Sequence, residues 1–324
     1  MRRLPACLAA AILACSSDPA APPDATLDAT VDAAPDVAAD VAPDEPAPDA
    51  PPPWRCVRNR RPPAEPAQCN GAASLCARRY DRVAYATTHN AMSSEEDHFA
   101  APNQNFGLTR QLRDGVRGLM LDAHPWQDDL WLCHGICLAG RRRLAEGLCD
   151  VGRYLDEDPG AVVTILFESY IDAAQMETAF READLLDDVV AQPVGAPWPT
   201  LGAIARTGRR LVVFTDRAGG ERPWLHDMWT WAEENPYAAT TPAELDCRAN
   251  RGRAGNSLFI LNHFLTAPLA SPDLARMVNF NPGLADHATR CAAERGVFPN
   301  FITVDFYDIG DVLAVARARN EMTP

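Results

Sequence analysis

The chain has 324 residues, of which 47% are hydrophobic, and its 30 arginines stand against 44 acidic residues, for a formal net charge of −14. It contains no lysine, which excludes Schiff-base catalysis and a Walker-type phosphate loop because both need a lysine amine. An acidic chain lacks the basic surface that nucleic-acid binding requires, so we expect no nucleic-acid partner.

Residues 1–15 have the features of an export signal. Arg2 and Arg3 precede a short apolar stretch, Leu4 to Leu13, which is too short to span a bilayer as a helix. The stretch ends in Leu13-Ala14-Cys15 and resembles the lipobox of bacterial lipoproteins, in which the cysteine is lipidated. A plain secretory signal with an incidental cysteine is the alternative. We expect an exported lipoprotein, anchored through Cys15 and facing the periplasm or the cell surface.

Residues 16–53 differ in composition from the rest of the chain. They consist almost entirely of Ala, Pro, Asp, Val and Ser, with nine acidic residues, no basic residue and no aromatic residue before Trp54. Such a segment cannot bury enough apolar surface to offset the entropy of ordering it. We therefore predict a disordered linker over 16–53, followed by one folded domain over 54–324.

Eight cysteines lie beyond the signal segment and the linker: Cys56, Cys69, Cys76, Cys133, Cys137, Cys149, Cys247 and Cys291. An even number in an exported domain predicts disulfides, although eight cysteines allow 105 pairings. Cys69 with Cys76 and Cys247 with Cys291 are the preferred pairs. The two cysteines that flank His134 could belong to a metal cluster, but CxxC spacing is absent and a local disulfide is favoured.

Apolar segments alternate with helical segments from residue 82 onward. The predicted strands are Val83–Ala86, Gly115–Asp122, Leu130–Cys133, Ala161–Phe167, Arg210–Thr215, Leu258–Asn262 and Phe301–Phe306. Helices are predicted over Leu108–Asp114, Arg142–Leu155 and Ala173–Val190. This alternation favours an α/β fold with a parallel sheet closed into a TIM-type β/α barrel, regular or irregular. An open doubly wound sheet is disfavoured because no glycine-rich loop follows the first strand.

Polar residues follow several of the predicted strands, at the edge of a barrel where active sites form. His89 and Asn90 follow the first strand, Asp122 ends the second, His134 follows the third and Glu168 follows the fourth. Two histidines can share phosphodiester cleavage, one as general base and one as general acid. Asn90, Asp122 and Glu168 offer the hard oxygen ligands that Ca²⁺ prefers.

Four segments together resemble the X-region of phosphoinositide-specific phospholipases C: Thr88-His89-Asn90, Gly115 to Asp122, Cys133-His134-Gly135 and Leu166-Phe167-Glu168. The resemblance implies that His89 and His134 are catalytic and that Asn90, Asp122 and Glu168 bind calcium. The family's second strand carries an E-x-D pair. Here Met120 replaces the glutamate and Asp122 matches the aspartate, so one family ligand is missing. Calcium-independent bacterial relatives carry an arginine at the position of Asp122, so Ca²⁺ is the expected cofactor here.

Three further assignments concern the remainder of the domain. Thr303 to Tyr307 is similar to the last barrel strand of the bacterial branch, which implies that Asp305 supports His89. Arg117 is the candidate for contacting substrate, with a structural role as the favoured alternative because it lies within a predicted strand. Trp224, Trp229 and Trp231 could form a lipid-facing lip, since indoles favour membrane interfaces, or could belong to the core.

The resemblance implies a phosphoric diester hydrolase or lyase of the phosphatidylinositol-specific phospholipase C type, acting as a monomer on phospholipid at a membrane surface. His89 would deprotonate the inositol 2-hydroxyl and His134 would protonate the departing diacylglycerol. One alternative is a glycerophosphodiesterase or sphingomyelinase D type of enzyme, which typically opens with H-R-G and keeps the E-x-D pair. Another is a non-catalytic lipid- or glycan-binding lipoprotein, for which Met120 is the best support.

Overall fold

The computed structural model describes residues 54–322. The predicted signal peptide with Cys15 and the predicted linker over 16–53 lie outside the described residues. Within them, no helix is both long and apolar enough to cross a membrane.

Eight parallel strands form a curled sheet in the order β7-β6-β5-β2-β1-β10-β9-β8. β7 and β8 stand at the two ends of this order and are not paired with each other, although α5 joins them directly in sequence. The predicted TIM-type barrel is therefore confirmed in an irregular form that is open between β7 and β8. The parallel strands are β1 (Tyr85–Thr88), β2 (Gly118–Trp126), β5 (Val163–Ser169), β6 (Leu211–Thr215), β7 (Leu225–Asp227), β8 (Ala232–Glu234), β9 (Leu258–Asn262) and β10 (Phe301–Val304).

Helices surround the sheet and supply one face of its core. They are α1 (Leu108–Asp114), α2 (Leu144–Glu157), α3 (Ala173–Glu182), α4 (Leu201–Arg206), α5 (Met228–Trp231), α6 (Pro272–Val278), α7 (Gly283–Arg295) and α8 (Val312–Glu321), with 3₁₀ turns η1 (Ala73–Ala77), η2 (Tyr80–Arg82), η3 (Cys137–Ala139) and η4 (Pro242–Glu244). Local chemistry fixes some of their ends. Asp172 and Gln175 form a capping box at the start of α3.

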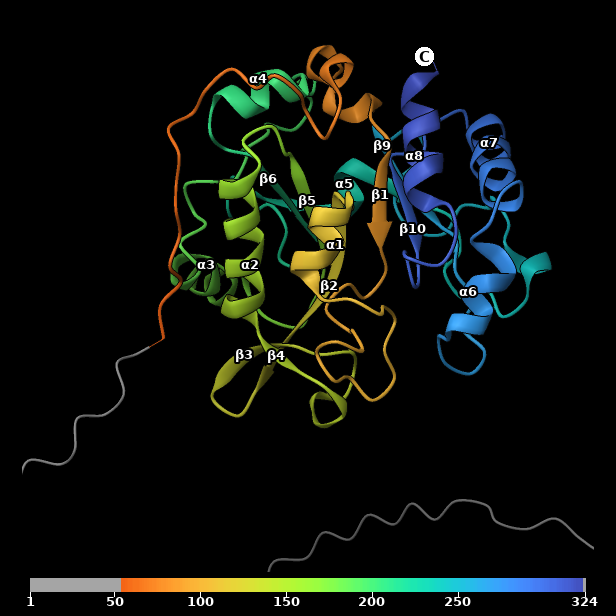
Figure 1. Ribbon diagram of the computed structural model, residues 1–324, viewed down its shortest axis with the longest axis horizontal. Helices are drawn as coiled ribbons and strands as arrows, with labels where there is room; N and C mark the ends of the chain where they lie inside the picture. The colour runs from red at the N-terminus through yellow and green to blue at the C-terminus, as the bar shows by residue number, and fades with distance from the viewer. Residues whose placement is uncertain (1–53, 323–324) are drawn as a thin grey trace, which may run out of the picture. The chain divides into compact units, whose positions relative to one another are not determined.

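The strands bury both faces, and this alternation aims the polar residues of the site. On β2, Leu119 and Leu121 belong to the core between sheet and helices, whereas Met120 packs against a second core inside the barrel. Asp122 has the same parity as Met120, so it also faces the barrel interior. In Figure 1 the arrow of β1 points toward the end of the barrel that carries β3 and β4, while α4 covers the opposite end.

One predicted barrel strand is wrong. Leu130–Cys133 was expected to be the third parallel strand, but β3 (Asp129–Leu132) runs antiparallel to β2 and pairs on its other side with β4 (Arg142–Arg143). The reason is a two-residue turn. Gln127 and Asp128 both have positive φ, 47° and 56°, which is the backbone of a tight hairpin. The prediction also missed β7 and β8. Each has only three residues, which are too few to show the alternation of apolar and polar side chains that marks a strand.

The prediction that three tryptophans face lipid is also wrong for two of them. Trp231 is 6% exposed in the inner core, and Trp224 packs against the outer core. Trp229 lines the pocket described below.

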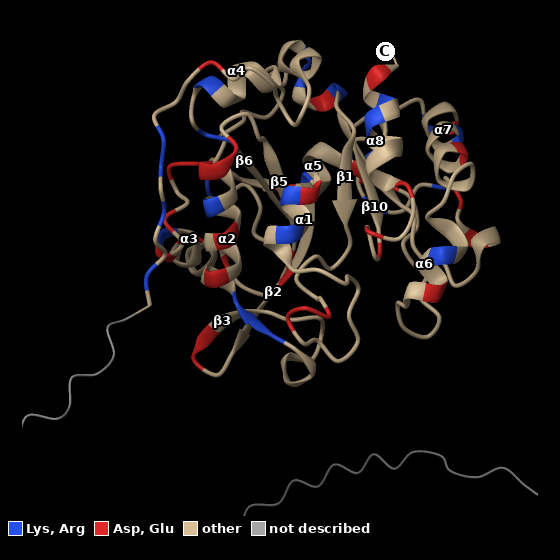
Figure 2. Ribbon diagram, viewed as in Figure 1, with Lys and Arg blue, Asp and Glu red and all other residues tan. Residues whose placement is uncertain are grey.

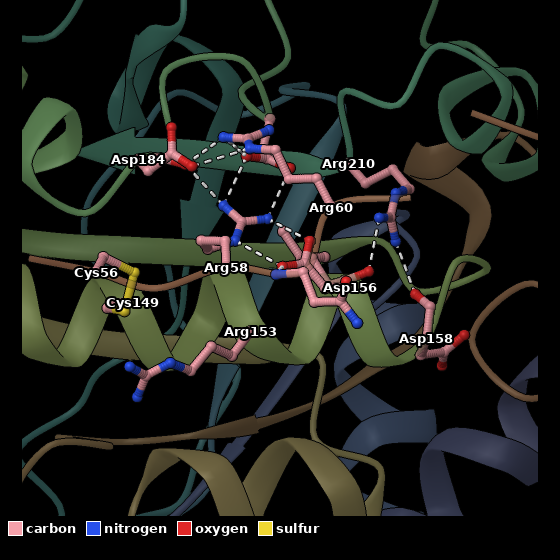
Figure 3. Close-up of polar contacts among 12 residues, drawn as sticks. Cys56, Arg58, Arg60, Cys149, Arg153, Asp156, Asp158, Asp184 and Arg210 are labelled. Carbon is pink, nitrogen blue, oxygen red and sulfur yellow. Dashed lines mark hydrogen bonds and ion pairs between the residues drawn. A yellow bond between two sulfur atoms is a disulfide. The ribbon is translucent and has the colours of Figure 1, made fainter. Parts of the chain in front are cut away.

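Residues 54–72, which precede η1 and are called the strap here, are held against the domain by a disulfide and by ion pairs. Cys56 forms a disulfide with Cys149 of α2, and Arg58 is buried in ion pairs with Asp156 and Asp188 (Figure 3). Arginines recur along this strap beside acidic residues of the domain (Figure 2). The preferred pairs Cys69–Cys76 and Cys247–Cys291 are confirmed, as is the local Cys133–Cys137 disulfide.

Candidate active site

A cavity of about 270 Å³ opens among the carboxyl ends of the parallel strands and gathers most of the polar residues predicted from the sequence. Larger hollows exist elsewhere, including one of about 540 Å³ beside α8, but they lack this set of titratable groups. The cavity is lined by His89, Asn90, Met120, Asp122, Leu166, Phe167, Glu168, Asp216, Met228, Trp229, Glu234, Tyr237, Arg251, Ile260, Asn262 and Phe264.

His89 is fixed at the end of β1 by backbone and side-chain contacts. Its amide donates to the carbonyl of Val304, which continues the pairing of β1 with β10. The buried amide of Gln104 donates to the carbonyls of both His89 and Val304, at 2.8 and 3.2 Å. The imidazole stacks face to face on Phe264, with ring centres 3.9 Å apart. These contacts leave the ring little freedom to rotate.

Asp305 lies behind His89 and orients its ring. His89 Nδ1 is 3.0 Å from Asp305 Oδ1, and Asn103 Nδ2 donates to the same oxygen at 2.9 Å. Asp305 is 3% exposed, and its buried carboxylate accepts a hydrogen bond from Nδ1–H, which leaves a lone pair on Nε2. The contact that the resemblance implied is present. Its part in catalysis belongs to the proposal below.

The backbone turns sharply at the ends of β1 and β10. Asn90 and Phe306 have positive φ, 45° and 47°, a conformation that costs a bulky residue such as phenylalanine on the order of 1–3 kcal/mol. Both residues directly follow a member of the histidine–aspartate pair. The strained turns therefore lie where the chain leaves the barrel and presents His89 and Asp305.

His134 comes from the loop after β3, inside the five residues closed by the Cys133–Cys137 disulfide. Although its side chain is exposed at the rim, the surrounding protein lowers its pKa by desolvation first and by the charge of His89 second. His134 is thus close enough to His89 to sense its charge, and Glu168 acts on it in the opposite direction. His134 does not line the cavity, and its relation to the site is the effect that the charges of His89 and Glu168 have on its pKa.

Three carboxylates converge on the floor and rim of the cavity. Asp122 is 7% exposed, and its pKa is raised well above the usual range by burial first, then by the charges of Glu168 and Asp216. Glu168 lies at the rim, where it accepts a hydrogen bond from the Tyr170 hydroxyl. Asp216 accepts from the amide of Ser169 at 2.8 Å. Asp216 follows β6 and supplies a third carboxylate that the calcium assignment did not include.

This donor set suits a calcium ion in its chemistry. Asn90, Asp122, Glu168 and Asp216 offer only oxygen ligands, and the like charges around Asp122 call for a cation. Met120 lines the cavity next to them and supplies no hard ligand. Within residues 54–322 these carboxylates do not form a cluster with all ligand atoms inside 4.8 Å, so binding would need small side-chain movements.

Arg251 contributes a guanidinium group to the lining of the cavity, and the sequence analysis did not predict it as a site residue. Burial acts to lower its pKa, but the ion pair with Glu234 at 2.5 Å outweighs burial and raises it. The guanidinium carbon lies 4.5 Å from the Trp229 ring centre and 4.6 Å from that of Tyr237. Arg251 precedes β9 in an irregular loop, so no pattern marks it.

The structure places Arg117, the candidate for contacting substrate, away from the cavity. It precedes β2 at the amino end of the barrel and lines the hollow beside α8. Its guanidinium donates to the carbonyls of Leu112 and Val116 at 2.7 and 2.8 Å. Arg117 therefore has the structural role that was the alternative, and it makes no contact with Asp122.

His124 is a further histidine of the site. It lies two residues after Asp122 on β2, and its ring stacks on Tyr170 with centres 4.2 Å apart. The i, i+2 spacing from Asp122 could have indicated the same face. Its charge also acts on His134, so it helps to set the environment of the rim.

Comparison with known proteins agrees with this geometry. The sequence model of the family PI-PLC X 1 matches residues 75–320. The chain is 28% identical over 284 residues to the "PI-PLC X domain-containing protein 1" of Arthroderma benhamiae, which covers 80% of this chain and 91% of that one. It is 30% identical over 271 residues to the "PI-PLC X domain-containing protein At5g67130" of Arabidopsis thaliana, with 74% of this chain and 62% of that one covered.

Solved structures show the same fold at low identity. The phosphatidylinositol-specific phospholipase C of Listeria monocytogenes superposes with a TM-score of 0.52 at 14% identity, covering 76% of this chain and 96% of that one. A Staphylococcus aureus phosphatidylinositol-specific phospholipase C gives 0.54 at 14% identity, covering 76% and 95%. With the family match extending over most of the described residues, the chain belongs to the PI-PLC X family.

Proposed function

We propose that this protein is a phosphoric diester hydrolase or lyase of the phosphatidylinositol-specific phospholipase C type, which cleaves a phospholipid headgroup by two-histidine acid–base chemistry. The observation that carries the proposal is the His89–Asp305 pair at 3.0 Å, with the His89 ring lining the cavity and its charge acting on His134. Family membership and the fold of the solved phospholipases support it.

His89 acts as the general base in this proposal. With its Nδ1 proton held by Asp305, Nε2 takes the proton of the headgroup 2-hydroxyl, and the hydroxyl oxygen attacks phosphorus. The carboxylate of Asp305 stabilises the imidazolium that forms, as a buried acid does behind a catalytic histidine. The flat stack on Phe264 keeps Nε2 aimed at the attacking oxygen.

His134 acts as the general acid. As the new phosphorus–oxygen bond forms, the bond to the diacylglycerol oxygen breaks, and that alkoxide takes a proton from the His134 ring. The products are a cyclic phosphodiester and diacylglycerol.

Calcium would be held by Asn90, Asp122 and Glu168, with Asp216 as a further ligand. When bound, the ion would neutralise charge on the phosphate and lower the pKa of the attacking hydroxyl. The headgroup would contact Arg251 and the rings of Trp229 and Tyr237, which line the cavity. A single arginine already paired with Glu234 favours a headgroup without additional phosphates.

Export and membrane attachment fit this substrate. A relative that is 27% identical over 291 residues is described as an "Uncharacterized secreted protein" of Arthroderma benhamiae. Four disulfides within the described residues agree with an oxidising compartment. We propose that the chain is exported and that lipidated Cys15 holds it at the membrane that supplies its substrate.

Leaving-group chemistry tests the two roles. His134→Ala should lose activity on phosphatidylinositol but retain most of it on an inositol phosphodiester with a nitrophenyl leaving group, which needs no protonation. His89→Ala should lose activity on both, and ³¹P NMR should show a cyclic phosphate from the wild type. His98→Asn, at an exposed histidine that does not line the cavity, is the matched control. Equal losses for His134→Ala on both substrates would overturn the assignment of the general acid.

A further inference from the structure

Gln104 bonds to both of the strand ends that carry the His89–Asp305 pair. The regular pairing of β1 with β10 ends at Thr88 and Val304, so His89 and Asp305 are each the first residue beyond it. Gln104 belongs to the connection between β1 and α1 and is buried, with 0% exposure. Its Nε2 donates to the carbonyl oxygens of His89 and Val304, at 2.8 and 3.2 Å. One side chain therefore joins the two strand ends directly.

The chemistry of these contacts requires a carboxamide. The oxygen of the Gln104 side chain accepts a hydrogen bond from the amide of Tyr307 at 3.1 Å. The nitrogen faces two backbone carbonyls, which can only accept, and its two hydrogens match them. A carboxylate would place acceptors against acceptors, and an apolar side chain would leave the two carbonyls and the Tyr307 amide without this partner. Glutamine satisfies all three backbone groups at once.

The backbone after Asp305 needs this support because it is strained. Phe306 has a φ of 47°, and a bulky residue keeps such a conformation only where the surrounding structure over-determines it. The Phe306 amide donates to the carbonyl of Asn103 at 2.8 Å, and the next amide, that of Tyr307, donates to the Gln104 side chain. Two adjacent residues thus hold two consecutive amides of the turn that presents Asp305.

The same two residues are fixed to the segment that follows β1. The amides of Asn103 and Gln104 both donate to the carbonyl of Ser93, at 2.8 and 3.0 Å. Their other contacts reach across to the end of β10 and the turn after it. They therefore set the separation of His89 and Asp305, which are 216 residues apart in the sequence.

We propose that Gln104 is a positioning residue, which keeps the His89 ring and the Asp305 carboxylate at hydrogen-bond distance by joining the two strand ends. It acts through these residues, because it does not line the cavity itself. Without its contacts the turn at Phe306 relaxes, Asp305 withdraws from Nδ1, and the ring proton is no longer held there. The consequence for catalysis rests on the proposed function, whereas the consequence for the His89 ring does not.

Gln104→Met tests the proposal in the full-length chain, because methionine keeps the length of the side chain and removes all three hydrogen bonds. The ¹⁵N shifts of the His89 ring should show its proton shared between Nδ1 and Nε2, whereas the wild type holds it on Nδ1. On phosphatidylinositol vesicles kcat should fall roughly 100-fold, the loss that a displacement of about 1 Å causes. KM should change little because the lining of the cavity is intact.

Two further substitutions at this position keep the test decisive. Gln104→Asn has an amide that is one methylene too short to reach both strand ends, and it gives the same readout if methionine prevents folding. Gln104→Glu is the conservative variant. Burial favours its neutral acid, whose O–H donates to one carbonyl while the other oxygen accepts from Tyr307. It should return the His89 proton to Nδ1 and restore part of kcat.

Asn300→Leu is the matched control at the amino end of the same sheet. Asn300 is also 0% exposed, and its side chain donates to the carbonyl of Val83 at 3.2 Å and accepts from the amide of Phe259 at 3.0 Å. Loss of this buried amide should lower stability in urea unfolding, as Gln104→Met does. It should leave the His89 proton on Nδ1 and kcat near the wild-type value.

The position of the His89 ring proton decides the outcome. The proposal is overturned if Gln104→Met leaves that proton on Nδ1, or if Asn300→Leu displaces it to the same extent. It is equally overturned if Gln104→Glu loses as much as Gln104→Met in both measurements. If the wild type cleaves no phospholipid, the proposed function fails, and the ring proton still decides the role of Gln104.

Discussion

Exchanging the two residues that meet at the back of His89 tests whether Asp305 acts by charge or by fixing the tautomer. In the double variant Asn103→Asp/Asp305→Asn the net charge is unchanged and one carboxylate remains near the ring. The new carboxylate at 103 accepts a hydrogen bond from the amide N–H at 305, which places that nitrogen where Asp305 Oδ1 now lies, 3.0 Å from His89 Nδ1. The amide then donates to Nδ1, and the ring proton must move to Nε2.

The magnitudes separate the two explanations. Asn103 Nδ2 is 2.9 Å from Asp305 Oδ1, so the exchange moves the charge from about 3 Å to about 6 Å from Nδ1. At an effective dielectric of 20 this weakens the attraction to the imidazolium by about 3 kcal/mol, or roughly 100-fold in rate. A wrong tautomer blocks the base itself and costs roughly 10⁴-fold when asparagine replaces aspartate in a serine protease.

We predict the larger loss, on the order of 10⁴-fold in kcat, in the release of water-soluble phosphate ester from phosphatidylinositol vesicles. The ¹⁵N shifts of the His89 ring should show the proton on Nε2 in the variant and on Nδ1 in the wild type, whatever the activity. A loss near 100-fold with the proton still on Nδ1 would refute the tautomer argument.

Three further predictions concern the loop at the rim, the strap and a buried histidine. Cys133→Ser/Cys137→Ser should remove the restraint on the loop that carries His134, the proposed general acid, and should therefore lower kcat more than it changes KM. Because the disulfide closes so short a loop, its loss should cost ~2 kcal/mol of stability. Arg58→Met leaves the buried carboxylate of Asp156 without its arginine and removes one of the two arginines that pair with Asp188, so it should cost about 3–5 kcal/mol in urea unfolding, whereas the surface change Arg153→Met should cost little. Burial lowers the pKa of His226 to about 4, below its unfolded value near 6.5, so the folded state binds fewer protons. Stability should therefore fall by up to about 3 kcal/mol as pH drops from 6.5 to 4, and His226→Gln should flatten that fall in pH-dependent unfolding.

The local part of the site could be predicted from the sequence because its residues directly follow recognisable strands. His89 and Asn90 follow an apolar segment, and the barrel fold brings that edge together with Asp122 and Glu168. Cys69–Cys76 and Cys133–Cys137 were accessible because short spacing limits the choice of partner.

The remainder depended on contacts that no local pattern records. Arg251 reaches the cavity from an irregular loop and is held by Glu234 and two aromatic rings. Gln104 lies 15 residues after His89 yet bonds its carbonyl and that of Val304. Arg117 was misassigned because its sequence neighbours lie in the motif, while its position before β2 puts it at the wrong end of the barrel.

The most direct test of the proposed function is release of water-soluble phosphate ester from phosphatidylinositol vesicles by the full-length chain, with calcium and with a chelator. We predict release that requires calcium and is abolished in His89→Ala. Release that persists in the chelator would keep the two-histidine mechanism and remove calcium from it. Release that survives in His89→Ala, or no release from any phospholipid, would contradict the central claim and make Met120 the mark of a binding protein.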